Sequence, residues 1–326
     1  VPLFTGPDTA AGSSSPIPSY VDMRTMPFDK INRGYIQSWN VMYERKLPSD
    51  FVMSLGYVGT QTTRQLADNM LNWAGPSTEG STERRQEYPI RTTNTRYWDG
   101  WLSGNYHSLQ LAVNRRFTGG LFVKGAYTWG RAINRSDDEG WAGLTWNDPG
   151  LMSRNRAQAG YNRPHTLQIA TVYELPFGQD GDDVGSKILR NWQTNFIFSI
   201  NQNSPGTIGG SSPLNTASNS ATADQIGEVN KLGGIGEDDP YYDTSSFQNV
   251  SDRPGSGAEG EYLPGTDCDN SDGSWDCYGN VGRNMIRGPA WVNLDFSIFR
   301  DFAITEGTAL EFRSEFFNLT NTPHFN

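Results

Sequence analysis

Regular alternation of apolar and polar side chains constrains this chain more than any other feature of its sequence. Between residues 106 and 116 the apolar side chains occupy odd positions and the polar or small ones even positions: His107, Leu109, Leu111 and Val113 against Ser108, Gln110, Ala112 and Asn114. The same period of two recurs in stretches that start near Phe51, Leu121, Leu167, Trp192, Val292 and Leu310. Because successive side chains of a β-strand point to opposite faces, each stretch predicts a strand with one apolar and one polar face.

The connections between these stretches alternate in length. Residues 48–50, 118–120 and 305–307 are short and suited to tight turns, whereas residues 61–103, 133–163 and 204–289 are long and polar. Short periplasmic turns at one rim and long extracellular loops at the other are typical of a transmembrane β-barrel. Residues 176–190 fit this order least, because a long connection stands where a short one is expected.

We therefore predict an all-β fold for residues 1–326, in a single domain. The expected architecture is an antiparallel up-and-down meander that forms part of a larger transmembrane-type β-barrel, with residues 204–289 as its longest extracellular loop. The stretches also carry aromatic residues near their ends, namely Trp39, Tyr43, Tyr57, Trp129, Tyr173, Trp192 and Phe302. Barrels place such residues at the two membrane interfaces, although aromatic side chains are also common in strands of every kind.

Composition and charge exclude several classes of protein. No apolar run is long enough for a transmembrane helix, and the mean hydropathy is −0.61. The net charge of −10 argues against nucleic-acid binding, which requires a clustered basic surface. Carboxylates are dense between residues 224 and 276, where they form either a cation-attracting rim or simply a solvated loop.

Catalytic and metal-binding patterns are weak, so we predict that the protein is not an enzyme and needs no cofactor. The three histidines have no metal-ligand spacing, and Glu311 and Glu315 share a strand face with Arg313, as expected for a charge ladder in the barrel lumen. Asp267, Asp269 and Asp272 resemble a calcium loop only faintly, since their spacing is wrong for an EF-hand.

Cys268 and Cys277 are the only two cysteines and lie in one loop. Without a nearby histidine they make a poor zinc site. We predict a local disulfide, which requires an oxidising compartment, and the alternative is a pair of free thiols.

Aromatic residues among Gly and Asp are the candidates for ligand contact. Tyr97, Trp98 and Trp101 fall in one predicted loop, and Trp141 and Trp146 fall in another. If they are exposed, their rings suit stacking on a sugar or a peptide. The alternative is that these side chains pack the loops against each other.

Several short segments occur in a shared order from about residue 30 onward: Gln37-Ser38-Trp39-Asn40, Tyr57-Val58-Gly59-Thr60, Asn105-Tyr106-His107-Ser108-Leu109-Gln110, Arg115-Arg116-Phe117, Tyr127-Thr128-Trp129-Gly130-Arg131-Ala132-Ile133, Arg163-Pro164-His165, Tyr173-Glu174-Leu175-Pro176-Phe177-Gly178, Arg287-Gly288-Pro289, Asn293-Leu294-Asp295, and Phe312-Arg313-Ser314-Glu315-Phe316-Phe317-Asn318-Leu319. Together they resemble the C-terminal barrel of Oar-like TonB-dependent outer-membrane receptors, which carry a carboxypeptidase-regulatory-like N-terminal domain. The resemblance implies a 22-stranded barrel with an N-terminal plug in the bacterial outer membrane. It also implies uptake of a solute or export of a polypeptide, with energy delivered by the TonB complex through a TonB box.

The chain departs from that pattern in ways that leave other functions open. It shows no plug, TonB box or regulatory-like domain and about eight readable strands, so we expect a fragment of the barrel wall. Open strand edges would allow copies to pair into an extracellular filament, which is the main alternative to transport. An outer-membrane adhesin is a second alternative. A secreted carbohydrate-active protein would fit the aromatic residues but not the order of the loops.

Overall fold

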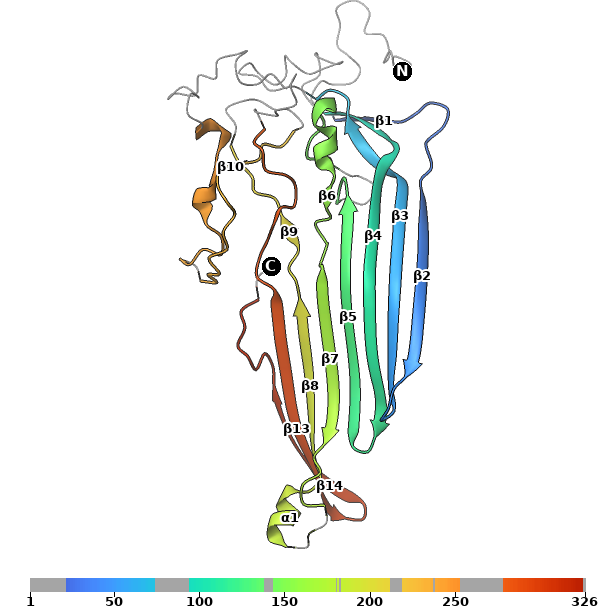
Figure 1. Cartoon of the computed structure of the whole chain (residues 1–326), viewed down its shortest axis with the longest axis vertical. Coiled ribbons are helices and arrows are strands. Elements are labelled where there is room, and N and C mark those ends of the chain that lie inside the picture. The colour runs from blue at the N-terminus through green and yellow to red at the C-terminus, as the bar shows by residue number, and fades with distance from the viewer. Residues whose placement is uncertain are drawn as a thin grey trace, which may run out of the picture.

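Eight long strands form one antiparallel meander in the computed structural model of the chain (Figure 1). The structure describes residues 22–73, 94–137, 143–179, 181, 183–211, 219–236, 238–252 and 278–324. The strands are β2 (Tyr35–Lys46), β3 (Phe51–Met70), β4 (Thr95–Thr118), β5 (Leu121–Asn134), β7 (His165–Glu174), β8 (Trp192–Asn201), β13 (Trp291–Thr305) and β14 (Thr308–Phe316), and each pairs with its neighbours in this order. The predicted all-β meander is therefore confirmed.

The remaining elements are short and lie mostly among the long connections. Two short strands join the large sheet: β1 (Met23–Thr25) pairs in parallel with β4, and β6 (Ala157–Gln158) pairs with β5. Two small two-stranded sheets stand apart from it, β9 (Pro205–Gly206) with β12 (Ile286–Arg287) and β10 (Asp224–Gln225) with β11 (Phe247–Gln248). The helices are α1 (Val184–Leu189), η1 (Pro149–Asn155), η2 (Thr244–Ser246) and η3 (Val250–Asp252). None of the helices in the described ranges is long and apolar enough to cross a membrane.

Tight turns lie at one end of the strands, which we call the turn rim. Residues 119–120 join β4 to β5, and both are glycines with positive φ (56° and 76°), the backbone that a two-residue hairpin turn requires. Ser49 and Asp50 take the same left-handed conformation between β2 and β3, with φ of 58° and 62°. The long connections 71–94, 135–164 and 202–290 all leave from the opposite end, the loop rim.

The first long connection is shorter than predicted, because β3 and β4 continue well beyond the other strands. Residues 65–70 of β3 pair with residues 96–102 of β4, so the predicted loop over 61–103 is wrong at both of its ends, over residues 61–70 and 95–103. The register shifts between Thr63 and Leu66, and Arg64 has a φ of 55°. Such a bulge changes which face the following residues occupy and so breaks the period of two on which the prediction depended.

The strand register places the predicted apolar side chains on one face of the sheet. Leu55, Leu111, Tyr127, Leu167, Ile200 and Val292 are directly paired from one strand to the next across six strands. The adjacent row on the opposite face consists of Ser54, Ala112, Ala126, Gln168, Ser199 and Asn293. We call these the apolar face and the polar face, and a lipid-facing wall with an aqueous lumen needs this division.

All seven aromatic residues predicted for the membrane interfaces lie on the apolar face. Three of them, Trp39, Tyr57 and Trp129, lie in two clusters towards the loop rim, and each cluster contains a histidine. The hydroxyl of Tyr57 lies 2.7 Å from His107 Nδ1, and that of Tyr127 lies 2.7 Å from His165 Nδ1. Trp129 stacks on His165 with ring centroids 6.4 Å apart. Rings with polar tips at strand ends suit the boundary between lipid and water.

The buried core lies beyond the loop rim rather than within the eight-stranded wall. The largest fully buried apolar side chains are Trp146, Tyr278, Leu102, Leu151, Val250 and Val281, and all belong to the long connections or to the extension of β4. Among the described residues no pairing joins β2 to β14, so the sheet is curved but open at both edges.

The assignment of faces predicts a large difference between two neighbouring substitutions. Leu111→Arg puts a charge on the apolar face and should lower the free energy of unfolding in phospholipid vesicles by about 2–4 kcal/mol. Gln110→Arg places the same side chain on the polar face and should change it by less than about 1 kcal/mol. Urea titration of both variants in vesicles tests the assignment, and equal losses would contradict it.

Candidate ligand-binding site in the long loops

Buried arginines hold the long connections together above the loop rim. We call this region the loop body; it comprises the described residues of 135–164 and 202–290 and the extended ends of β3 and β4. Arg154 Nη2 donates to the carbonyls of Gly279 and Val281 at 2.8 and 2.9 Å, and its guanidinium lies 4.2 Å from the Trp146 ring centre. Burial lowers the pKa of Arg154 to about 10, an effect that the nearby charges of Asp224 and Tyr278 oppose.

Arg283 connects the end of β5 to the last long connection. Its Nη1 lies 2.8 Å from Asp137 Oδ2, and its other nitrogens donate to the carbonyls of Asn134 and Asn155. Burial alone would raise the pKa of Asp137. Hydrogen bonds from Asn134, Gly160 and Asn284 and the charge of Arg283 outweigh burial and lower that pKa instead.

Arg287 performs a similar role closer to the wall. Its Nη1 donates to the carbonyls of Asn162 and Asn203 at 2.7 and 2.8 Å, and its Nη2 contacts the side-chain oxygen of Gln158. Tyr242 accepts from the backbone nitrogen of Arg287 at 3.1 Å and donates to its carbonyl at 2.7 Å. These bonds fix the small β9–β12 sheet above the ends of β7 and β8.

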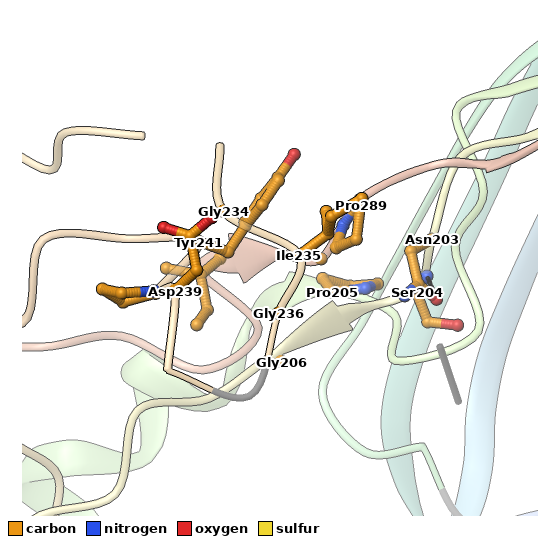
Figure 2. Close-up of a pocket in the computed structure, with 13 residues that line it drawn as sticks. Asn203, Ser204, Pro205, Gly206, Gly234, Ile235, Gly236, Asp239, Tyr241 and Pro289 are labelled. Atoms are coloured by element: carbon orange, nitrogen blue, oxygen red, sulfur yellow. Dashed lines mark hydrogen bonds between the residues drawn. The ribbon is translucent and has the colours of Figure 1, made fainter. Parts of the chain in front are cut away.

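A pocket of about 550 Å³ opens beside this sheet (Figure 2). Its lining residues come from the start of the last long connection, from the loop 234–241 and from the end of that connection: Asn203, Ser204, Pro205, Gly206, Gly234, Ile235, Gly236, Asp239, Pro240, Tyr241, Ile286, Gly288 and Pro289. Its volume is in the usual range for a small-molecule site.

Few polar side chains line this pocket, and one aromatic ring lies next to them. Asp239 supplies a carboxylate, Asn203 an amide and Tyr241 a ring. The ammonium of Lys231 lies 5.6 Å from the centre of the Tyr241 ring, a cation–π contact that helps to position the ring. An aromatic surface next to hydrogen-bonding groups suits a neutral polar ligand such as a sugar or a peptide.

Three of the aromatic residues predicted to contact a ligand lie on a strand and not in an exposed loop. Tyr97, Trp98 and Trp101 lie on the extension of β4, where Trp101 Nε1 donates to the carbonyl of Ala67 at 3.1 Å. Tyr97 is half-buried, and burial followed by the charges of Asp99 and Asp29 raises its pKa. Ligand contact by Tyr97 and Trp98 stays a prediction.

Trp146 is 0% exposed, so the expectation of an exposed ring is wrong for this residue. Its neighbour Leu144 packs with Trp101 against Ala67 and Leu102, which joins the two predicted aromatic groups through packing. A second pocket of about 280 Å³ lies there, lined by Asp68, Met70, Arg96, Gly143, Leu144, Asn147, Asn219 and Ser220.

Several sequence predictions lie outside the described residues. They concern Trp141, the disulfide between Cys268 and Cys277, and the aspartates 267, 269 and 272. Within the described ranges no group of three or more His, Cys, Asp and Glu side chains could hold a metal ion. Arg313 and Glu315 pair at 2.5 Å along one strand, whereas the prediction was of charges that pair across strands. Glu311 lies directly opposite Asp301 on β13, another carboxylate, so the register does not give the predicted cross-strand ladder at these positions.

Sequence reasoning missed the pocket beside β9 and the three arginines of the loop body. Glycine and proline supply most of the pocket lining, and these residues signal turns rather than binding. Arg283 and Asp137 are 146 residues apart, a pairing that no local pattern reveals. The run Arg287-Gly288-Pro289 was the one available signal, since it is among the segments that carry the family resemblance.

Comparison with known proteins gives a family match, together with a likeness to solved structures. The family model described as outer membrane beta barrel domain matches residues 2–326. Among solved structures the chain is similar to the outer membrane transporter YddB from Escherichia coli, with 7% sequence identity and a TM-score of 0.45. That likeness covers 93% of this chain and 31% of the YddB chain, so this chain spans under a third of that protein's length. No curated protein matches the sequence.

Removing the Arg283 guanidinium should loosen the loop body without unfolding the wall. Arg283→Met removes one of the four hydrogen-bond donors to Asp137 and the donor to two backbone carbonyls, which should cost about 1–3 kcal/mol of local stability. Cleavage of intact cells by proteinase K should then accelerate within 135–164 and 278–290. Arg116→Met, an exposed change at the turn rim, serves as the matched control and should leave cleavage unchanged.

The lowered pKa of Asp137 also predicts how the loop body responds to acid. Its carboxylate stabilises the folded loops fully above its unfolded pKa of about 3.8 and loses that contribution as the pH falls through the lower folded value. Asp137→Asn should therefore be less resistant to protease than the wild type at pH 7, and the difference should shrink below about pH 4. A difference that stays constant with pH would contradict this role.

Proposed function

This chain belongs to the outer membrane β-barrel domain family and lies in the bacterial outer membrane, and from that premise we propose that it forms part of a TonB-dependent receptor wall. In this proposal the receptor binds a solute or polypeptide at the extracellular loops and moves it across the membrane. The TonB complex would act through a plug region of the kind that the Oar-like resemblance implies. The chain itself would carry out no chemical reaction.

The observation that carries the proposal is the openness of an eight-stranded wall. A closed barrel of eight strands has an interior just wide enough for its own side chains or for one small ligand. Here eight strands curve without β2 meeting β14 in the described residues, so the complete wall needs further strands. A barrel with more strands encloses a wider lumen. The polar face would line that lumen, as passage of a hydrated ligand requires.

The loop body supports a role in binding. Arg287 donates to the carbonyl of the lining residue Asn203, while Arg154 and Arg283 tie residues 279–283, just before the lining residue Ile286, to the neighbouring connection; these bonds preorganise the pocket beside β9. Its lining residues belong to the last long connection, beyond the loop rim, and in this proposal that rim faces the cell exterior, where a receptor first meets its ligand. The net charge of −10 argues against nucleic acid as that ligand.

A growth experiment tests transport and the pocket together. A strain without this gene should lose growth on at least one limiting source among an iron chelate, a corrinoid, an oligosaccharide and a peptide. The wild-type gene should restore growth, but only when TonB is intact. Restoration with Tyr241→Ala should need about tenfold more of that source, because a lost aromatic contact is worth about 1.4 kcal/mol.

Glu306→Gln, which changes the β13–β14 turn at the opposite rim, is the control and should restore growth fully. Growth of the deletion strain on every source, or restoration without TonB, would overturn the proposal. If the Tyr241→Ala gene restored growth at the same concentration of that source as the wild-type gene, only the role of the pocket in ligand binding would be rejected.

Edge pairing between copies is the second candidate, because β2 and β14 each have a neighbour on one side only in the described part of the sheet. Unpaired strand edges recruit further strands in water. Electron microscopy of the purified protein in detergent separates the two functions: regular fibres would favour assembly, and single particles would favour a transport barrel.

A further inference from the structure

Helix α1 lies at the turn rim, in the one connection that departs from the rule of short turns (Figure 1). The helix begins after Asp183, whose side chain accepts a hydrogen bond from the Ser186 backbone nitrogen. Its large apolar side chains point away from the protein. Val184 is 74% exposed, Ile188 57% and Leu189 53%, and Phe177 in the same connection is 57% exposed. In water such a group of exposed side chains is unfavourable.

Two side chains of the apolar face hold the C-terminal end of α1. Arg300 on β13 and Trp192 on β8 are directly paired across the strands, in a row that also contains Phe312. The Arg300 guanidinium donates to the carbonyls of Lys187 and Ile188, and Trp192 Nε1 donates to the Ile188 carbonyl at 2.9 Å. The helix therefore packs against the lipid-facing side of the wall and not against the lumen.

These bonds make the backbone of α1 suitable for a site with little water. The last carbonyls of a helix have no partner within the helix, and leaving them unpaired near hydrocarbon is costly. Here Ser186 accepts from the Arg190 backbone nitrogen at 3.0 Å, and the side chains of Arg300 and Trp192 pair the next two carbonyls. Arg300 itself is only 9% exposed and lies 4.2 Å from the Phe302 ring centre.

We propose that α1 lies in the periplasmic leaflet of the outer membrane, with Val184, Ile188 and Leu189 among phospholipid acyl chains. The cationic side chains of Lys187 and Arg190 then stand at the level of the phosphate groups. The occupant is phospholipid because the helix continues the apolar face of a wall that already spans the membrane, at the rim that carries short periplasmic turns. This inference depends on the outer-membrane location and not on transport.

Fluorescence quenching in phospholipid vesicles tests the proposal on the intact protein. Cys268 and Cys277 are changed to Ser, and an environment-sensitive dye is attached at Ile188→Cys. Its emission should shift to the blue, aqueous iodide should fail to quench it, and nitroxide-labelled phospholipid should quench it. The same dye at Glu306→Cys, in the β13–β14 turn of the same rim, should show iodide quenching and no blue shift.

A second variant shows whether the Arg300 bonds place the helix. With Arg300→Met in the same background, the dye at position 188 should become accessible to iodide while the sheet retains its circular dichroism. Equal iodide quenching at 188 and 306 in the parent protein would overturn the proposal. A dye at 188 that is shielded from iodide but not quenched by lipid nitroxide would also overturn it, because α1 would then face another protein segment.

Discussion

Pairing of backbone polar groups inside hydrocarbon is the constraint on which the rest of this structure depends. A strand in lipid must hydrogen-bond on both sides, because an unpaired N–H or C=O there costs several kcal/mol. Six of the eight long strands meet this condition, since each lies between two neighbours. Within the part of the chain that the structure describes, the outer edges of β2 and β14 have no neighbour, so further strands or another copy would have to pair them in a membrane. At the end of α1 the carbonyls of Lys187 and Ile188 are also paired, by Arg300 and Trp192, which meets the same condition at the location proposed for this helix.

Beyond the membrane the loop body solves the equivalent problem with arginine. Its backbone is irregular, and many of its carbonyls lack a strand or helix partner. A guanidinium offers five donors in a planar fork, so one side chain pairs several carbonyls at once. Arg154 reaches Gly279 and Val281, and Arg287 reaches Asn162 and Asn203. These contacts join segments more than 80 residues apart, so the loops hold a preformed pocket without a regular core of their own.

The two faces of the wall could be predicted from sequence because each side chain there has a single environment. Leu111 and Gln110 are adjacent on β4 and therefore point to opposite faces, and each has the polarity of the face to which it points. Prediction failed where that rule is interrupted. Arg64 adopts a left-handed conformation within a register shift, so the extension of β3 was taken for a loop and Trp101 was placed in it.

The contacts within the loop body could not be predicted from the sequence, for a different reason. Partners such as Arg283 and Asp137 are 146 residues apart, and the geometry that joins them belongs to the whole fold. Trp146 is an example of a residue whose environment local sequence does not reveal. Its neighbours in sequence include glycines and aspartates, but in the structure its side chain is completely buried beside Arg154. Local composition indicates that loops are polar but does not indicate which of their rings face inward.

The length of β4 determines how far the sheet extends beyond its lipid-facing band. At about 3.4 Å per residue its 24 residues span about 80 Å, whereas the lipid-facing band of such a barrel is only about 25 Å tall. Even if the strands are steeply tilted, the paired ends of β3 and β4 extend beyond this band. In the orientation proposed above, this extension holds Trp98 and its neighbours outside the lipid-facing band, within the loop body.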